Sequence, residues 1–213
     1  MRVLLALLGS LLLAAGTPPD EIAGTYRLEG MPDAAGELQL RADGRFAYIL
    51  AYGALDERAE GSWLRRDRQV DLTTQPKPVA PVFRLVSSSA RTPGSPMVQV
   101  TWPNGRGIAG VDILVGFGAG EPIAGYTQEQ GWGLPAEERR TPRWIELSEP
   151  VYHLESPRFP LDCSDPCAIR VVLVPNDLGV IDFTGIAVDL LPNELRMHRG
   201  ASELRFVRQA ASP

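Results

Sequence analysis

The sequence contains few of the residue types that carry catalytic or nucleic-acid chemistry. Lys77, between Pro76 and Pro78, is the single lysine among 21 basic residues, so a P-loop lysine is absent. No serine occupies a G-x-S-x-G elbow, and there are only two histidines. The formal net charge of −5 leaves no broad positive surface for phosphates. These absences argue against a nucleotide-binding enzyme and against a nucleic-acid partner.

One glycine motif resembles a dinucleotide fingerprint. Gly105, Gly107 and Gly110 satisfy the G-x-G-x-x-G spacing. That fingerprint requires a helix after the glycines, whose N-terminus meets the pyrophosphate. Here the residues at 111–115 are rich in valine and isoleucine and indicate a strand. The glycines are explained by a hairpin turn, and no cofactor is expected.

The first sixteen residues have the pattern of a signal peptide. Arg2 precedes the apolar run 3–15, and the small residues Ala14 and Gly16 permit cleavage before Thr17. The run is short for a membrane span, and the acidic, proline-rich segment 18–21 favours removal over a retained anchor. A bacterial lipoprotein signal would require cysteine where Thr17 stands. We therefore expect a periplasmic or secreted protein that is not a lipoprotein and has no membrane span after cleavage.

The composition, with 21 glycines and 19 prolines, favours short strands joined by turns. We expect an all-β protein whose first domain covers residues 22–88. Asp43-Gly44 is typical of a hairpin turn, because glycine readily adopts positive φ. Alternating apolar residues predict strands at 22–28, 37–40, 46–52, 61–64, 69–73 and 82–86.

Aromatic side chains gather on one face of the strand at 46–52. Phe46, Tyr48 and Tyr52 share a face with Leu50, because alternate residues of a strand point the same way. Packing in a core is the simplest explanation. The alternative is that Phe46, Tyr48, Tyr52 and Trp63 line the mouth of a ligand-binding barrel.

The strand starts of this first domain carry a family resemblance. Gly24-Thr25-Tyr26 and Gly61-Ser62-Trp63 each open a strand, and Asp43 to Phe46 forms an Asp-Gly-Arg-Phe hairpin. Residues 22–88 resemble in this respect the lipocalin-like small barrels of exported bacterial proteins. The resemblance implies a small antiparallel barrel, which in that family sometimes holds an apolar ligand.

The small and proline-rich residues at 89–96 predict a linker. Beyond it, strands separated by turns predict an immunoglobulin-like or prealbumin-like β-sandwich over residues 97–208. The segments 110–113 (Gly-Val-Asp-Ile) and 127–132 (Thr to Trp) are similar to carboxypeptidase regulatory-like domains. The resemblance implies an accessory module for adhesion or presentation, without catalytic residues.

The two cysteines, Cys163 and Cys167, are four positions apart. In an exported chain this spacing favours a local disulfide that fixes the turn before the next strand. The alternative is a copper or redox thiol site that recruits His153, His198 or Met197. Two isolated histidines make a weak ligand set, so no metal is expected.

Neighbouring carboxylates occur at Asp56-Glu57 and Glu137-Glu138, and both pairs are explained by solvated loops. Trp132 and Trp144 flank the second pair. They could stack on a sugar, but burial in the sandwich is the simpler explanation.

These observations favour a non-catalytic binding or interaction protein of the bacterial cell envelope, whose partner would be an envelope protein or a polysaccharide. A carrier of a small apolar ligand in the first domain is the alternative. A thiol or copper protein is the third hypothesis.

Overall fold

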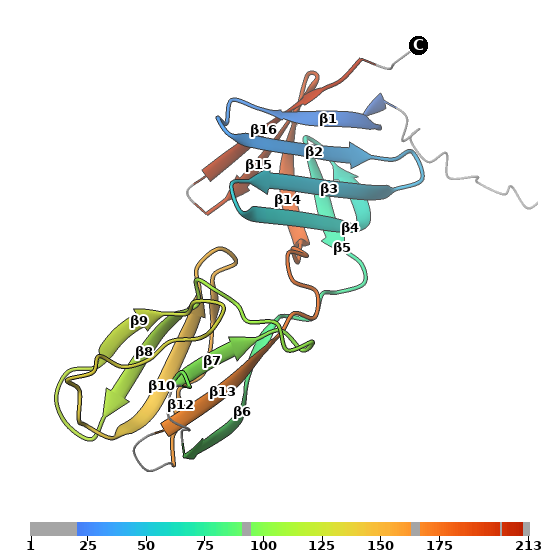
Figure 1. The fold of residues 1–213 in the computed structure, drawn as a ribbon. Coiled ribbons are helices and arrows are strands. Elements are labelled where there is room, and N and C mark those ends of the chain that lie inside the picture. The colour runs from blue at the N-terminus through green and yellow to red at the C-terminus, as the bar shows by residue number, and fades with distance from the viewer. Residues whose placement is uncertain (1–20, 91–94, 163–166, 201, 211–213) are drawn as a thin grey trace, which may run out of the picture.

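The computed structural model describes residues 21–90, 95–162, 167–200 and 202–210. Within these residues the regular structure consists of β-strands, without an α-helix, which confirms the all-β class. A barrel and a separate pair of sheets are joined by two connections (Figure 1). No helix in the described part of the chain is long and apolar enough to cross a membrane. The predicted signal peptide, residues 1–16, lies outside the described residues.

Eight antiparallel strands close the barrel. Each strand pairs with the next strand of the barrel along the chain, and β16 pairs with β1 to complete the circle. The circle thus follows an up-and-down order with one long excursion between β5 and β14. The barrel strands are β1 (Gly24–Glu29), β2 (Ala34–Leu40), β3 (Arg45–Tyr52), β4 (Leu55–Arg66), β5 (Gln69–Thr74), β14 (Thr184–Leu191), β15 (Glu194–Arg199) and β16 (Ser202–Arg208).

The interior of the barrel is filled by side chains. Phe46 and Tyr48 of β3 are buried, and the ring centroid of Tyr48 lies 5.1 Å from that of Phe183 and 6.2 Å from that of Phe206. The alternation predicted for β3 is correct, since Ile49 on the opposite face is exposed. The predicted hairpin turn at Asp43-Gly44 also joins β2 to β3, with Gly44 at φ 81°.

Two sheets form the second part. One contains β8 (Asp112–Phe117), β9 (Ile123–Tyr126), β10 (Pro142–Glu149), β11 (Leu154–Glu155) and β12 (Phe159–Pro160). The other contains β6 (Val82–Ala90), β13 (Cys167–Val174) and β7 (Val98–Thr101), and its β7 runs parallel to β13. Apolar residues of both sheets form one core, with Ile113 and Ile145 from the first and Val98 and Val171 from the second. The two sheets are therefore packed as a sandwich.

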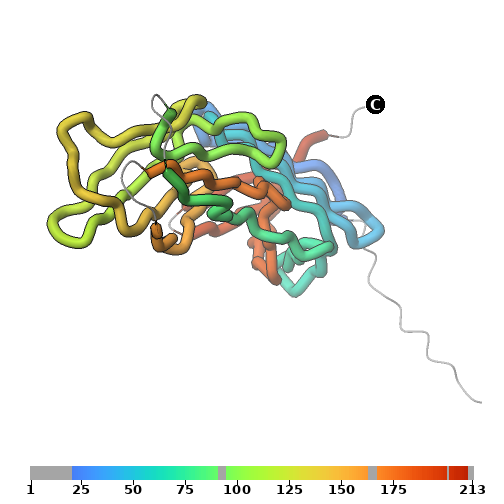
Figure 2. Tube along the Cα trace, turned by 60° about the horizontal axis from the view of Figure 1, so that its bottom comes forward, coloured from blue at the N-terminus to red at the C-terminus, as the bar shows by residue number. Residues whose placement is uncertain are grey.

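The strand pairing divides the chain differently from the expected sequential domains, 22–88 and 97–208. β14, β15 and β16 complete the barrel, whereas β6 is an edge strand of the sandwich. Ser89 and Ala90, which the sequence assigns to a linker over 89–96, pair with β13, and residues 91–94 lie outside the described residues. The sandwich is thus an insertion in the barrel. In Figure 1 the first and last barrel strands, β1 and β16, lie together, away from the green and yellow strands of the sandwich, and Figure 2 shows the same chain trace with the bottom of that view turned forward.

Candidate functional site

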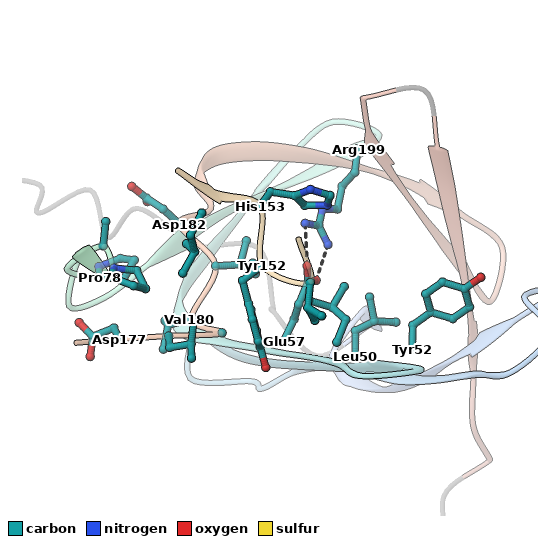
Figure 3. A pocket seen from close by; sticks show the side chains of 18 of the residues that line it. Leu50, Tyr52, Glu57, Pro78, Tyr152, His153, Asp177, Val180, Asp182 and Arg199 are labelled. Atoms are coloured by element: carbon teal, nitrogen blue, oxygen red, sulfur yellow. Dashed lines mark hydrogen bonds and ion pairs between the residues drawn. The ribbon is translucent and has the colours of Figure 1, made fainter. Parts of the chain in front are cut away.

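A cleft with a volume of about 650 Å³ lies between one end of the barrel and the sandwich. Three parts of the chain form its walls: the barrel mouth at the ends of β3, β4, β15 and β16; residues 77–81 and 177–182 of the two connections; and residues 151–154 of the sandwich (Figure 3). Hydrogen bonds within and between these parts fix their positions, and the cleft lies where the three parts meet.

An ion pair between Glu57 and Arg199 lies at the barrel mouth. Arg199 Nη1 lies 2.5 Å from Glu57 Oε2, and Nη2 lies 3.1 Å from Oε1. This two-pronged arrangement is the geometry for which a guanidinium is suited. Tyr48 donates a further hydrogen bond to Glu57 Oε2 at 3.2 Å. The Glu57 side chain is 6% exposed and that of Arg199 is 29% exposed, so Arg199 is the partner that reaches the cleft.

The surroundings fix the protonation of this network. Burial raises the pKa of Tyr48, and the neighbouring Glu57 carboxylate raises it further, so the phenol keeps its proton and donates a hydrogen bond to Glu57. The hydrogen bond to Glu57 raises the pKa of Arg199 and keeps it charged. The barrel mouth therefore contains one positive and one negative charge, held in fixed positions.

The connection before β14 forms one lip of the cleft. Its backbone bonds to β4, since Arg58 N donates to Gly179 O at 2.8 Å and Ile181 N donates to Arg58 O at 2.9 Å. Gly179 has φ of 78°, and a Cβ there would lie 2.6 Å from Asp56 O. Glycine is required at this position for both reasons. The lip is therefore a fixed part of the barrel mouth.

The two connections are also bonded to each other. Val79 N donates to Asp177 Oδ2 at 2.8 Å, and Asn176 Nδ2 donates to Ala80 O at 2.7 Å. Asp177 N donates in turn to Val79 O at 3.1 Å. The chain therefore leaves and rejoins the barrel at adjacent points, and both connections border the cleft.

The sandwich contributes the turn between β10 and β11. Glu149 accepts hydrogen bonds from Val151 N at 3.4 Å and Tyr152 N at 2.8 Å, which closes the turn. His153 follows in left-handed conformation with φ of 53°. Tyr152 and His153 both line the cleft (Figure 3). Among the described residues of the sandwich sheets, this turn and Leu154, which begins β11, line the cleft.

Apolar side chains make up most of the remaining lining. Leu50 and Leu204 belong to the barrel core and end at the mouth, and Met31 packs against the same core. The connections and the sandwich turn add Pro78, Val79, Leu178, Val180, Ile181, Val151 and Leu154. The cleft is thus an apolar recess with the Glu57–Arg199 pair at its barrel end.

The structure separates the four residues proposed from the sequence as ligand-lining. Phe46, Tyr48 and Trp63 are buried in the barrel core. Trp63 is tied to the opposite end of the barrel, where its Nε1 donates to Arg41 O at 2.9 Å. Tyr52 is 48% exposed and lines the cleft, because it ends β3 beyond the last core layer.

The two tryptophans considered for sugar stacking lie on different faces of the sandwich sheet. Trp132 packs against the sandwich core beside Gly125, where a Cβ would come within 2.3 Å of its Nε1. Trp144 lies over Gly116, its pairing partner on β8, and Arg158 covers its ring at 3.9 Å from the centroid. The two rings therefore do not form one stacking platform.

The residues of the thiol and metal hypothesis are also dispersed. Cys167 is buried at the start of β13, His153 lines the cleft, and His198 lies on the barrel with its Nε2 3.1 Å from Asp189 Oδ2. Cys163 lies outside the described residues, so the Cys163–Cys167 disulfide stays a prediction. Among the described residues no group of three or more potential ligands could hold a metal ion.

Glu57 and Arg199 are both site residues that sequence reasoning missed. The sequence suggests a solvated connection at 54–57, whereas β4 begins at Leu55 and Glu57 is 8% exposed. The alternation of β4 carries the signal. Counting back by twos from Trp63 through Gly61 and Ala59 assigns Glu57 to the interior face.

Glu138, from the other carboxylate pair, lies in a loop of the sandwich. The Arg140 guanidinium donates to it from Nη2 at 2.6 Å and from Nε at 3.0 Å. Hydrogen bonds from Arg140 lower the pKa of Glu138 to about 2. Arg140 also lies 4.0 Å from the centroid of the Phe117 ring. Glu138 therefore holds in place a loop that precedes β10, whereas the turn that lines the cleft follows β10.

Comparisons with protein-family models, with curated proteins and with solved structures found no match to this chain.

Proposed function

We propose that this protein is an exported, non-catalytic binding protein of the bacterial cell envelope that holds a small, largely apolar molecule in the cleft at the barrel mouth. The observation that carries the proposal is the cleft itself. Its volume of about 650 Å³ falls within the range of about 300–1,000 Å³ that is usual for small-molecule sites. Its position between two structural units and its apolar lining with a few fixed polar groups are typical of such sites.

Three further observations support parts of this proposal. The pattern of residues 1–16 supports export. The up-and-down order of eight strands supports the lipocalin-like resemblance, because lipocalins share that order. The side chains that fill the barrel favour a site at its mouth over one in its interior. The likeness of the sandwich to carboxypeptidase regulatory-like domains remains part of the proposal.

Binding of a neutral fluorescent probe, N-phenyl-1-naphthylamine, tests the proposal. Ala80 is exposed and lines the cleft, so Ala80→Trp fills part of the recess from its rim. Ala119→Trp adds the same side chain to an exposed turn of the sandwich and is the matched control. We expect saturable binding to the wild-type protein and to Ala119→Trp, and binding weakened at least about tenfold in Ala80→Trp. Equal binding by both variants, or none by the wild type, would refute the proposal.

Native mass spectrometry of the protein purified from its own envelope, without reducing agent, complements this test. A mass excess that disappears in Ala80→Trp and persists in Ala119→Trp would identify the natural occupant. The same spectrum reads the Cys163–Cys167 disulfide as a loss of two hydrogens.

A second candidate function is interaction with an envelope protein or a polysaccharide through the sandwich. The observation that favours a protein partner is the edge strand β6, where Val82 is 38% exposed and Val86 is 60% exposed. An extended segment of another protein can add to such an edge through backbone hydrogen bonds. If it does, Val86→Lys will abolish co-purification of the partner, and Arg84→Lys, an exposed change on the same strand, will leave it intact.

A further inference from the structure

The charged groups of the cleft are all engaged within the protein. Glu57 accepts from Arg199 and Tyr48, and the Asp177 carboxylate accepts from Val79 N. Asp182 accepts from Thr184 Oγ1 at 2.6 Å and lies 3.7 Å from Lys77 Nζ. Glu57 and Asp182 are thus each paired with a cation, and Asp177 is held by a backbone N–H of the connection.

The positive groups offer no better site for an anion. Arg199 is neutralised by Glu57, and Lys77 lies on the rim with its side chain 79% exposed, beside Asp182. Three aspartate or glutamate residues face one lysine and one arginine in the lining. A carboxylate or phosphate group would therefore lose its hydration and meet a wall that is, on balance, negative.

Arg199 nevertheless retains hydrogen-bond donors. A guanidinium has five N–H groups, and the three hydrogen bonds to Glu57 and Tyr48 use three of them. Its orientation is held by Glu57, so a remaining N–H can donate to a ligand oxygen without loss of side-chain entropy. Such a donor, in a recess without net positive charge, suits an uncharged acceptor.

We infer that the occupant of the cleft is an uncharged, largely apolar molecule bearing a carbonyl or hydroxyl oxygen, which accepts a hydrogen bond from Arg199. This inference rests on the proposed function, because it names the ligand class of the same cleft. The apolar body lies against Leu50, Leu204 and the connection at 177–182, and the oxygen lies at the barrel end of the recess.

Displacement of N-phenyl-1-naphthylamine from the wild-type protein by matched chains at pH 7 tests the inference. The four competitors are 1-decanol, methyl decanoate, decanoate and decylammonium, each measured below its micelle-forming concentration. We expect the alcohol and the ester to displace the probe at concentrations at least about tenfold lower than the two ions. Decanoate meets a lining that is on balance negative, and decylammonium loses its hydration beside carboxylates that already accept hydrogen bonds from the protein. Tighter or equal binding of decanoate or decylammonium overturns the inference.

The role of Arg199 is tested by comparing methyl decanoate with undecane, which lacks the ester oxygens. In the double variant Glu57→Met/Arg199→Met both charges are replaced together, so neither is left buried alone. We expect the preference for the ester over the alkane to fall toward one in this variant. An unchanged preference assigns the oxygen to another donor and refutes the inference.

The two proposals fail in different ways. If the probe does not bind, or binds equally to Ala80→Trp and Ala119→Trp, the proposed function fails. If the probe binds in the cleft but an ionic competitor is preferred, the cleft is a binding site and only the inferred ligand class is wrong.

Discussion

Glu57 and Arg199 are 142 positions apart in the sequence and form a two-pronged ion pair at the mouth of the barrel. The pair joins β4, in the first part of the barrel, to the end of β15, in the part that follows the sandwich. The pair therefore forms only when β14, β15 and β16 have joined the first five strands.

Removing one partner of this pair should destabilise the protein. Glu57→Gln leaves the Arg199 charge without its counterion, and loss of one member of a buried pair typically costs about 3 kcal/mol. The free energy of unfolding in urea measures the effect. Glu60→Gln changes an exposed residue of the same strand and is expected to shift it by less than about 0.5 kcal/mol. A Glu57→Gln effect as small as that of Glu60→Gln would contradict this prediction.

Gly116 is required by the ring of Trp144. A Cβ at position 116 would lie 1.8 Å from Trp144 Cε2, whereas one at Gly118 meets nothing within 4 Å. We expect Gly116→Ala to destabilise the protein by about 1–3 kcal/mol and to change its tryptophan fluorescence, because the ring must move. Gly118→Ala is the control, and thermal unfolding compares the two. Indistinguishable melting temperatures would count against this packing.

The barrel should fold without the sandwich. Each part has its own core, and the two connections are hydrogen-bonded at Val79–Asp177 and Ala80–Asn176, so a short flexible linker can replace residues 82–174. We expect a soluble all-β protein with a single cooperative unfolding transition by circular dichroism. A broad, non-cooperative transition would show that the barrel depends on the sandwich.

The loop of Glu138 should lose stability in acid. Hydrogen bonds from Arg140 lower the folded-state pKa of Glu138 to about 2, below the usual value of 4.5. A lowered carboxyl pKa stabilises the folded state above the unfolded value, and this contribution disappears as pH falls from 4.5 toward 2. Glu138→Gln should therefore lower the melting temperature at pH 7 but not at pH 2, with Glu137→Gln as the neighbouring control. A difference that does not depend on pH would rule out this origin.

Local patterns in the sequence predict strands and turns well. The alternation in Phe46, Tyr48 and Leu50 correctly identifies the interior face of β3, and Asp43-Gly44 correctly identifies its turn. Closure of the barrel leaves no comparable local pattern. Leu28 pairs with Phe206, and nothing near either residue in the sequence indicates the other. The sequence therefore places the three last strands in the sandwich, whereas they close the barrel.

Local sequence patterns do not predict the candidate site, because its residues come from distant parts of the chain. The barrel end of the cleft requires Glu57 and Arg199 together, and the walls of the cleft require a turn of the sandwich to lie near the barrel mouth. Glu57 follows Asp56 in the sequence, and such an acidic pair resembles a solvated loop. Small serine-rich segments also resemble linkers, although Ser89 and Ala90 of the predicted linker pair with β13 as part of the edge strand β6.

The insertion of the sandwich between β5 and β14 sets an order on folding during synthesis. All strands of the sandwich emerge before β14. The sandwich can therefore fold while β1 still lacks its partner β16 and β5 still lacks its partner β14. Two open sheet edges then persist until the last strands arrive, and such edges are prone to pair with other chains. A chain that ends before β14 would thus present a folded sandwich attached to an unclosed, aggregation-prone half of a barrel.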